Sequence, residues 1–359
     1  MIKFILKRLF YGFLVLLGVI TVVFLLFNVL PGDPARMMLG QRADQVSIDA
    51  INKDLGRDRS LNTQFLMYLN DLSPISIHEP TNKTHFLYLN PDKYTSYKKL
   101  FSVSATKVVV LKYPYLRRSY ISKRKVADIV RDTLPETTIL AFSSIAFGSF
   151  FGILIGIFSA IRKNTWFDKL ALVFAILGMA LPSFFIGLII AWFFGFILRD
   201  YTGLNNVGSL FVTDDFGDEH LTLKNLILPT VTLGLRPLAV IIQLTRNSLL
   251  DVLSQDYIRT AVAKGVSFNK VIFKHALKNA LNPVITAISG WFAGLMAGAV
   301  FVEIIFNWKG IGYEVVDALN KNDLPVVMGA TLIFAVIFVL INITVDIVYG
   351  ILDPRVRVQ

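Results

Sequence analysis

The chain has 359 residues, of which 54% are hydrophobic and only 17% are charged. Charged residues make up about a quarter of an ordinary soluble domain, so this composition predicts a membrane protein. The absence of cysteine excludes disulfides, thiolate metal sites and cysteine nucleophiles, and the four histidines are too scattered for a metal-ligand set. The formal net charge of +11 is spread over loops beside apolar runs, which favours anionic lipid rather than nucleic acid as a partner.

Six apolar runs are long enough to cross a bilayer as helices. A hydrocarbon core of about 30 Å needs about 20 helical residues. The first run follows Lys3, Lys7 and Arg8 and has no cleavage site after it, which is typical of an uncleaved anchor. Pro182 predicts a kink in the third run. The expected spans are Leu9–Leu30, Thr137–Ile161, Leu170–Leu198, Leu226–Leu249, Val284–Phe306 and Val326–Ile351.

The positions of lysine and arginine predict the orientation of these spans. If the N-terminus is cytoplasmic, the inner loops carry Arg162, Lys163, Lys169 and the basic run Ser254–Pro283. The short outer loops are richer in acids, and the loop between the first two spans is too long, at more than about 60 residues, for its charges to matter. Both termini are therefore expected in the cytoplasm of a multi-pass protein of the bacterial cytoplasmic membrane.

The long outer loop divides by pattern into helical and β-prone parts. Asp44–Gly56 and Leu61–Leu72 have helical periodicity, whereas Thr84–Asn90 and Thr106–Tyr113 are short β-prone runs bounded by prolines. The sequence thus predicts a small α+β extracytoplasmic insert that serves as a structural cap or as a docking surface. The expected parts of the chain are residues 1–30, the insert 31–136, and a five-helix core 137–359 that contains the loop 254–283.

The basic loop between the fourth and fifth spans is long enough to form two short helices. Tyr257–Lys264 favours one helix, and Gly265 suits a left-handed C-cap before Ser267 or Asn269 begins the next. Pro283 is tolerated at the start of the fifth span. On the second helix, one face is expected to carry Lys270, Lys274 and Lys278, and another Phe273, Ala276, Leu277, Ala280 and Leu281.

Pattern alone leaves two interpretations of this loop open. A basic amphipathic helix commonly lies on anionic lipid. A helix, a glycine turn and a second helix also make a rigid projection through which a cytoplasmic partner could push on the spans.

Several motifs in register resemble those of one family. They are "YIRTAVAKG" (Tyr257–Gly265), "HALKNALNP" (His275–Pro283), "PGDP" (Pro31–Pro34), "LPTVTLGL" (Leu228–Leu235), "LTRNSLLDVL" (Leu244–Leu253), Glu303-x-x-Phe-x-Trp-x-Gly-x-Gly312 and Asp346-x-x-Tyr-x-x-x-Asp-Pro-Arg355. In this order they are similar to permeases of binding-protein-dependent ABC importers, in the dipeptide, oligopeptide and nickel branch. The resemblance spans nearly the whole chain except about residues 73–124.

The resemblance implies an all-α membrane protein with six transmembrane helices of the type I ABC importer permease fold, carrying the small insert. It implies that the basic loop is a coupling helix seated in a groove of a cytoplasmic ATPase. The coupling residues carried over by position are Tyr257, Arg259, Ala261, Lys264, Gly265, His275 and Asn279. Arg259, Thr260 and Lys278 depart from the family's general acidic, alanine and proline positions, which weakens the case for a carboxylate contact to the ATPase.

The resemblance also implies partners: a second homologous permease subunit, two ATPase subunits that bind ATP and Mg²⁺, an extracytoplasmic binding protein and membrane lipid. The chain itself has no Gly-x-x-x-x-Gly-Lys-Ser/Thr loop and no hydrolase motif, so no enzymatic activity, catalytic residue, metal site or cofactor of its own is expected. The implied function is import of peptides, most of all oligopeptides.

Charged and small residues within the spans suggest further sites. Arg236, between Gly234 and Pro237, is a candidate contact for substrate carboxylates or a structural partner of a backbone carbonyl. Glu303 and Asp346 match family positions of structural or gating importance, and an ion pair or a helix cap is the favoured interpretation of each. A stripe of Gly148, Gly152 and Gly156 predicts close helix packing, either within the chain or between subunits.

Two alternatives remain open at this point. Permeases for nickel and metal chelates share these motifs, and a membrane-anchored interaction protein without transport would also carry an outer domain. An ion-coupled transporter acting alone is disfavoured, because it would ordinarily show paired intramembrane acids or repeat-related broken helices and neither is evident in the sequence.

Overall fold

The computed structural model describes residues 2–29, 46, 48–49, 52, 56–82, 85–91, 93–94, 96–214 and 216–352. These residues form two compact units. The first contains Met1–Gly12, Thr133–Glu314 and Ile337–Gln359, and the second contains Phe13–Asp132 and Val315–Val336. The expected helix Asp44–Gly56 lies largely outside the described residues, as do the motif Pro31–Pro34 and the final Asp353–Arg355.

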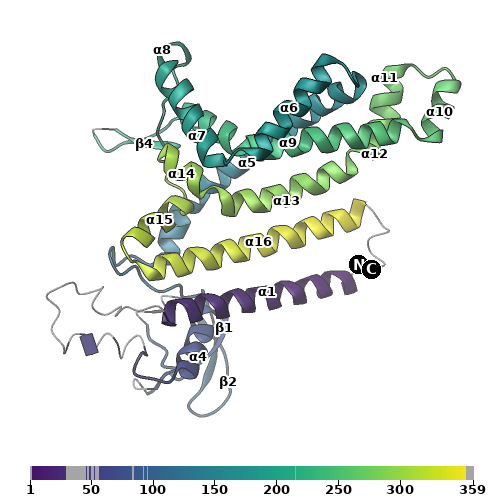
Figure 1. Cartoon of the computed structure of the whole chain (residues 1–359). Coiled ribbons are helices and arrows are strands. Elements are labelled where there is room, and N and C mark those ends of the chain that lie inside the picture. The colour runs from purple at the N-terminus through teal and green to yellow at the C-terminus, as the bar shows by residue number, and fades with distance from the viewer. Residues whose placement is uncertain are drawn as a thin grey trace. The chain divides into compact units, whose positions relative to one another are not determined.

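Four helices are long and apolar enough to cross a membrane unbroken. They are α1 (Ile2–Val29), α5 (Val126–Ile161), α9 (Lys224–Leu253) and α16 (Leu324–Leu352) (Figure 1). Two further candidates are bent pairs: α6 (Trp166–Ala180) with α7 (Ser183–Trp192), and α13 (Asn282–Gly298) with α14 (Val300–Phe306). If each pair counts as one span, the described residues contain the six spans that the sequence predicts.

The third span is broken at Pro182, where the sequence predicts only a kink. Helix α6 and the segment Ser183–Ile197 meet at 109°. Pro182 has no N–H to continue the helix and forces the residue before it out of the helical region; Leu181 accordingly has ψ of 136°. Beyond α7 the chain continues as a π-helical turn, Phe193–Ile197, and the short helix α8 (Arg199–Thr202).

Helices α5 and α9 are held close by the glycine stripe of α5. A Cβ atom at Gly148 would lie 2.9 Å from the carbonyl oxygen of Gly234, and one at Gly152 would lie 2.8 Å from Ile241. A Cβ at Gly156 would lie 2.9 Å from the carbonyl oxygen of Ile242. The stripe therefore serves internal packing against α9, which settles the two interpretations of it.

Short helical segments follow α9 before the next membrane helix. They are α10 (Asp256–Ala263), α11 (Phe268–Lys270), a π-helical turn Val271–Ala276 and α12 (Leu277–Ala280). Helix α13 begins beside Pro283, as predicted, and α15 (Ile311–Asn320) follows α14. A small hairpin of β4 (Phe211–Thr213) and β5 (Glu219–Leu221) lies between α8 and α9.

The insert contains one helix and one antiparallel sheet among its described residues. Helix α4 covers Leu61–Leu72 as predicted, and the sheet has the order β1 (Ile75–His78), β3 (Val108–Lys112), β2 (Tyr97–Ser102). Strand β3 lies in the predicted run Thr106–Tyr113. The run Thr84–Asn90 forms no strand in its described part: Tyr88 makes an isolated β-bridge with Glu79, and the residues before it form turns, in which His85 accepts the Leu87 N–H at 3.1 Å. Such local bonds compete with strand pairing.

Candidate coupling elbow and transport path

The loop between α9 and α13 folds back on itself at Gly265. Helix α10 ends at Ala263 with Lys264 as its C-cap, and the next residue, Gly265, has a left-handed φ of +77°. The Gly265 N–H donates to the Val262 carbonyl at 2.9 Å, and the Val266 N–H donates to the Ala261 carbonyl at 3.2 Å. This pair of bonds closes a helix end when the next residue is left-handed, a conformation that glycine adopts without steric cost. The predicted glycine C-cap is confirmed.

The second arm contains a π-helical turn that the sequence pattern does not predict. Residues Val271–Ala276 form this turn, whose hydrogen bonds span five residues instead of four. The change of phase buries Val271 and Ile272 and leaves the Phe273 side chain 62% exposed. Placing Phe273 on the apolar face is therefore wrong, whereas Ala276 and Ala280 are buried as expected and Ser267 occupies the N-cap position of α11.

Two of the predicted coupling residues connect the arms. The Asn279 side-chain amide, on α12, donates to the Tyr257 hydroxyl, on α10, at 2.9 Å. His275 is half-buried in the π-helical turn, while Lys264 and Arg259 are exposed. Arg259 lies 3.4 Å from Asp256 one turn earlier, an exposed ion pair. We call the segment Ser254–Pro283 the elbow.

The elbow is attached to two membrane helices by a buried apolar cluster. Ile258 and Val271 of the elbow pack with Ile157 of α5 and Leu249 of α9. The Ser248 hydroxyl of α9 also donates to the Ala280 carbonyl at 2.8 Å. A force applied to the elbow is therefore transmitted to α5 and α9, because close-packed interiors move as units and compress little.

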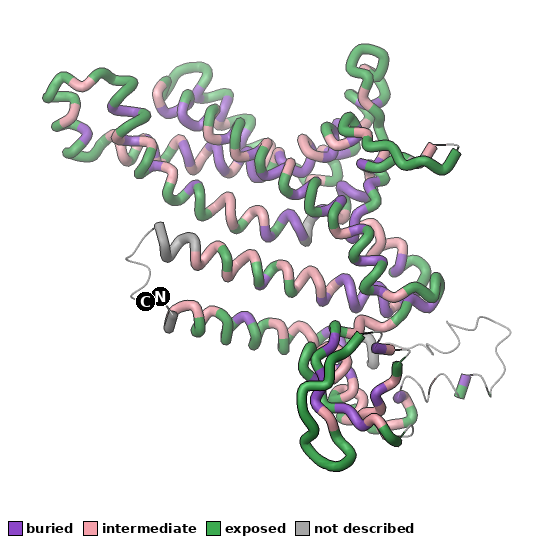
Figure 2. The backbone as a smooth tube through the Cα atoms, turned by 180° about the vertical axis from the view of Figure 1, so that it is seen from behind, coloured by how far each residue is buried: buried purple, intermediate pink, exposed green. Residues whose placement is uncertain are grey.

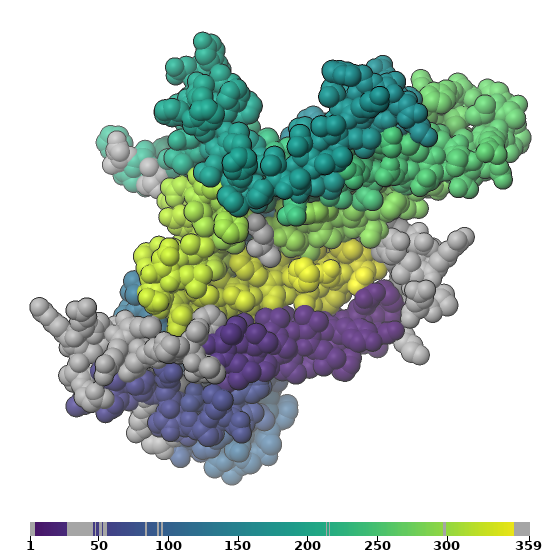
Figure 3. Space-filling model, in the orientation of Figure 1, coloured from purple at the N-terminus to yellow at the C-terminus, as the bar shows by residue number. Residues whose placement is uncertain are grey.

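The exposed surface of the elbow is apolar and basic and is not covered by the described chain. Tyr257, Val262, Phe268 and Phe273 are 44% to 62% exposed. Figure 2 shows α10 and α11 exposed along most of their length, and Figure 3 shows them protruding at the end of α9. The exposed cations around them are Arg259, Lys264, Lys270, Lys274 and Lys278. Apolar side chains grouped in this way are typical of a surface that receives a partner.

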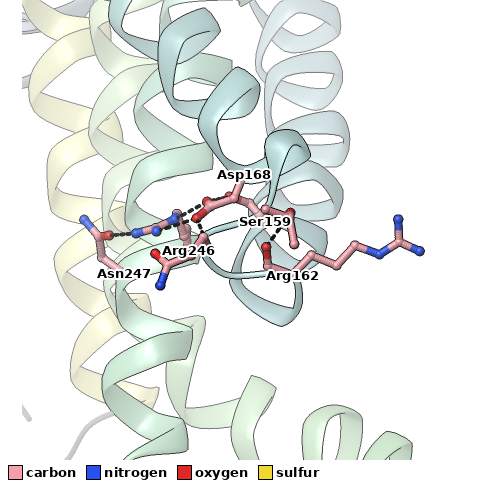
Figure 4. A network of polar contacts seen from close by, with 7 residues as sticks. Ser159, Arg162, Asp168, Arg246 and Asn247 are labelled. Atoms are coloured by element: carbon pink, nitrogen blue, oxygen red, sulfur yellow. Dashed lines mark hydrogen bonds and ion pairs between the residues drawn. The ribbon is translucent and has the colours of Figure 1, made fainter.

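A buried ion pair holds the same end of α6 and α9 together (Figure 4). Arg246 of α9 donates from Nε and Nη2 to the two carboxylate oxygens of Asp168 at 2.6 and 2.8 Å. The Ser159 hydroxyl and the Asn164 backbone N–H complete the shell of that carboxylate. Asp168 is 2% exposed. Two parallel bonds between a guanidinium and a carboxylate fix orientation as well as distance.

Sequence reasoning did not find the pair of Asp168 and Arg246. Both residues lie in helices of candidate membrane spans, Asp168 in the first turn of α6, and charges near spans are usually paired. A search for opposite charges at the same end of neighbouring spans would therefore have proposed this pair. The two residues are 78 positions apart in the chain. Only packing of α6 against α9 makes them partners.

A second polar network lies in the turn Asn307–Gly312, which we call the Trp308 turn. Glu303 is fully buried, and its carboxylate accepts the Thr137 hydroxyl at 2.6 Å and the Tyr313 N–H at 2.8 Å. The backbone N–H of Trp308 donates to the Glu303 backbone carbonyl at 2.8 Å. Glu303 therefore caps the first turn of α15 and joins it to α5, a helix cap and not an ion pair.

The glycines of this motif make room for that carboxylate. A Cβ atom at Gly310 would collide with the Glu303 carboxylate and the Thr137 hydroxyl, and one at Gly312 would lie 2.8 Å from Glu303 Oε2. Ser209 extends the network: its hydroxyl donates to Glu136 and accepts the Lys309 N–H at 2.8 Å. The spacing Glu303-x-x-Phe-x-Trp-x-Gly-x-Gly312 thus encodes one closed hydrogen-bonded turn.

Arg236 and Asp346 have separate surroundings. Arg236 is exposed on α9, and its guanidinium carbon lies 5.9 Å from the ring centre of Trp291 on α13. On α13, no atom lies within 4 Å of where a Cβ would stand at Gly290 or Gly294, so this helix has an open side. Asp346 of α16 pairs with Arg8 of α1 at 3.2 Å.

Comparison with known proteins agrees with this architecture. Residues 152–358 match the family of the binding-protein-dependent transport system inner membrane component, and residues 1–83 match the N-terminal family of the same systems. A glutathione transport system permease protein, GsiC, of Salmonella paratyphi A is 33% identical over 357 residues, 99% of each chain. The dipeptide transport system permease protein DppB of Alkalihalophilus pseudofirmus is also 33% identical, over 99% of this chain and all of its own.

Among solved structures, an inward-facing MetNI methionine ABC transporter is similar over 63% of this chain and 97% of its own, at 17% identity and a TM-score of 0.48. The family match covers more than half of the chain, and the two permeases align along nearly all of it. The chain belongs to the inner membrane components of binding-protein-dependent transport systems and is a multi-pass permease subunit of an ABC importer, in the branch of the GsiC and DppB permeases.

Proposed function

We propose that this subunit forms half of a translocation path for peptides, most of all oligopeptides, and that the elbow couples this path to ATP hydrolysis. The relatives named for glutathione and dipeptide transport support a peptide substrate more than nickel or a metal chelate. The complex would contain a second homologous permease subunit, two cytoplasmic ATPases that bind ATP and Mg²⁺, and an external binding protein. The permease itself would hydrolyse nothing.

The observation that carries the coupling role is the elbow's combination of an exposed surface and a buried root. Phe268 and Phe273 are more than half exposed, while Ile258 and Val271 pack against α5 and α9. A groove in an ATPase could therefore hold the exposed side, and its movement would tilt the two helices. We propose the orientation with the elbow and both termini in the cytoplasm and the insert outside, which the loop charges support.

The open side of α13 supports a path that is shared with the second subunit. Gly290 and Gly294 leave room beside α13. On the neighbouring helix α9, Arg236 lies over the ring of Trp291 of α13. Peptides carry a terminal carboxylate, which a guanidinium binds with well-oriented hydrogen bonds. Because the binding protein would deliver the substrate, one such contact would suffice in a path of low affinity.

The coupling role is tested by Gly265→Asn. Asparagine tolerates the left-handed conformation, and no atom lies within 4 Å of the added Cβ, so the isolated subunit should fold and insert normally. The added bulk should prevent docking, and peptide uptake in the assembled transporter should fall at least tenfold.

The matched control is Gly217→Asn, in the hairpin of β4 and β5. Gly217 is also left-handed, with φ of +92°, and also has open space around it. Uptake should stay within twofold of wild type. Normal uptake by Gly265→Asn, or equal losses in both variants, would refute the coupling role of the elbow.

The path role of Arg236 is tested with Arg236→Gln and three kinds of peptide: neutral, acidic and C-terminally amidated. Loss of the carboxylate contact should slow uptake of free-acid peptides and leave amidated peptides nearly unchanged. An equal loss for all three would assign Arg236 to structure, through its contact with Trp291, and not to the substrate.

A further inference from the structure

The second compact unit contains a cavity of about 420 Å³ between the insert, the first two turns of α5 and the third turn of α16. Its wall is formed by the segment after β3, by the chain before β2, by the start of α5 and by Ile333 of α16. This volume is within the usual range for sites that hold small molecules or headgroups. The cavity is separate from the elbow and from Arg236.

The wall of this cavity is basic. Lys93, Arg117, Lys125 and Arg131 line it, against the single acid Asp128 among the lining residues. Arg131 is exposed, and within the described part of the chain it has no ion-pair partner. The cavity also borders the N-terminal turn of α5, whose partial positive charge adds to that of the side chains. The wall therefore favours an anion.

Aromatic and apolar groups make the other part of the wall. Tyr94, Tyr113 and Tyr115 line the cavity, and the amine of Lys93 lies 5.9 Å from the ring centre of Tyr115. Tyr113 is 80% exposed. Ile333 belongs to the apolar stretch Leu324–Ile347 of α16, which is long enough to span the membrane. The cavity thus joins water-facing cations and tyrosines to a helix that faces hydrocarbon.

We propose that this cavity binds the phosphate headgroup of an anionic glycerophospholipid. The cations would donate to the phosphate oxygens, the tyrosines would occupy the interfacial level that they commonly take in membrane proteins, and an acyl chain would lie along α16 beyond Ile333. A bound lipid would tie the insert to the bilayer beside the first turns of α5 and Ile333 of α16. The proposal rests on membrane insertion alone, so it does not depend on peptide transport.

The experiment uses the full chain, purified in neutral detergent and returned to vesicles of phosphatidylcholine that contain a minor fraction of phosphatidylglycerol. Native mass spectrometry and phosphorus analysis after release measure the phosphatidylglycerol that stays bound. The variant Lys93→Gln with Arg131→Gln removes two cations of the wall. Retention should fall about fivefold per cation, since each basic residue near anionic lipid contributes that much to binding.

The control Lys98→Gln with Lys99→Gln removes two exposed cations from β2 of the same insert, outside the cavity, and should leave retention within twofold of wild type. A third variant, Ile333→Gln, places a polar group where the acyl chain would lie and should reduce retention without changing the charge. Circular dichroism spectra of the variants, compared with wild type, test whether the variants are folded.

Competition distinguishes the sources of the phosphate. Inorganic phosphate and glycerophosphate at the lipid's own concentration should not displace phosphatidylglycerol, because they lack the acyl contact; displacement by either would show a site for free phosphates and overturn the lipid proposal. Displacement by an acidic peptide would overturn it in favour of a carboxylate site. Equal retention by wild type and the cavity variants, or an equal loss in the control, would also refute the site.

Discussion

The elbow and the Trp308 turn both reverse the chain beside membrane helices, but they distribute their polar and apolar groups in opposite ways. In the Trp308 turn, Glu303, Trp308 and Ile311 are at most 1% exposed, and the carboxylate is bonded within the chain. In the elbow, Phe268 and Phe273 are more than half exposed. The Trp308 turn thus buries its groups and bonds the Glu303 carboxylate, while the buried Trp308 indole N–H has no partner among the described residues. A turn that receives a partner instead leaves its contact groups outside.

The ion pair of Asp168 and Arg246, like the Trp308 turn, is buried and bonded within the chain, and the largest expected effect lies there. Asp168→Asn would leave the Arg246 guanidinium without its buried partner charge, and loss of one member of a buried ion pair costs about 3–5 kcal/mol. We expect the free energy of unfolding in detergent to fall by about that amount, measured by denaturant titration. The control Asp251→Asn, exposed on α9, should change it by less than about 0.5 kcal/mol. Similar small effects in both variants would mean that the pair does not stabilise the packing of α6 against α9.

The Trp308 turn is tested by Gly310→Ala. The added Cβ would collide with Glu303 and Thr137, and such overpacking costs about 1–3 kcal/mol. The matched substitution Gly294→Ala, in α13, meets no atom within 4 Å and should leave the midpoint of thermal unfolding of the isolated subunit unchanged or slightly raised. The comparison of the two turns fails if Gly310→Ala is as stable as Gly294→Ala.

Two histidines outside the spans offer the same contrast: His78 of the insert is buried, whereas His220 of β5 is exposed. Burial, with help from nearby Lys112, lowers the pKa of His78 to about 4, while its ring nitrogens contact Ser76 at 3.0 Å and the Leu87 carbonyl at 3.2 Å. Between pH 6.5 and 4, the unfolded chain therefore binds a proton that the folded insert does not, so the stability of the insert should fall as the pH falls through this window.

Limited proteolysis of the insert at pH 7 and at pH 4.5 measures this loss. His78→Gln should reduce the difference between the two pH values, because the titrating group is gone. His220→Gln, which alters an exposed ring that contacts Asp214, should preserve the difference. A pH dependence that survives His78→Gln would assign it to other groups.

The smallest effect is expected inside the elbow. Tyr257→Phe removes the exposed hydrogen bond to Asn279, which contributes about 0.5–1 kcal/mol at most. The thermal midpoint should barely move, while hydrogen exchange of the amides in α12 should quicken relative to Tyr201→Phe, a change at a fully exposed tyrosine. Unfolding of the whole subunit by Tyr257→Phe would contradict an elbow held chiefly by its buried root.

Much of the architecture could be predicted because it depends on neighbours in the chain. Runs of about twenty apolar residues predict α1, α5, α9 and α16. In a bilayer no water is available to bond backbone N–H and C=O groups, so such a run must form a helix. The glycine C-cap of the elbow needed only Gly265 after a helical pattern. The in-register motifs predicted the family, since their order depends on the sequence alone.

The tertiary structure decided what joins distant positions. Arg246 meets Asp168 across 78 residues and Thr137 meets Glu303 across 166, and no periodicity encodes such pairs. It also decided the π-helical turn that exposes Phe273 and the 109° break at Pro182, where a local rule predicts an interruption but not its angle. The physical reason is common to all four: local sequence limits each backbone to a few conformations, and packing between helices chooses among them the one that buries and bonds its polar groups.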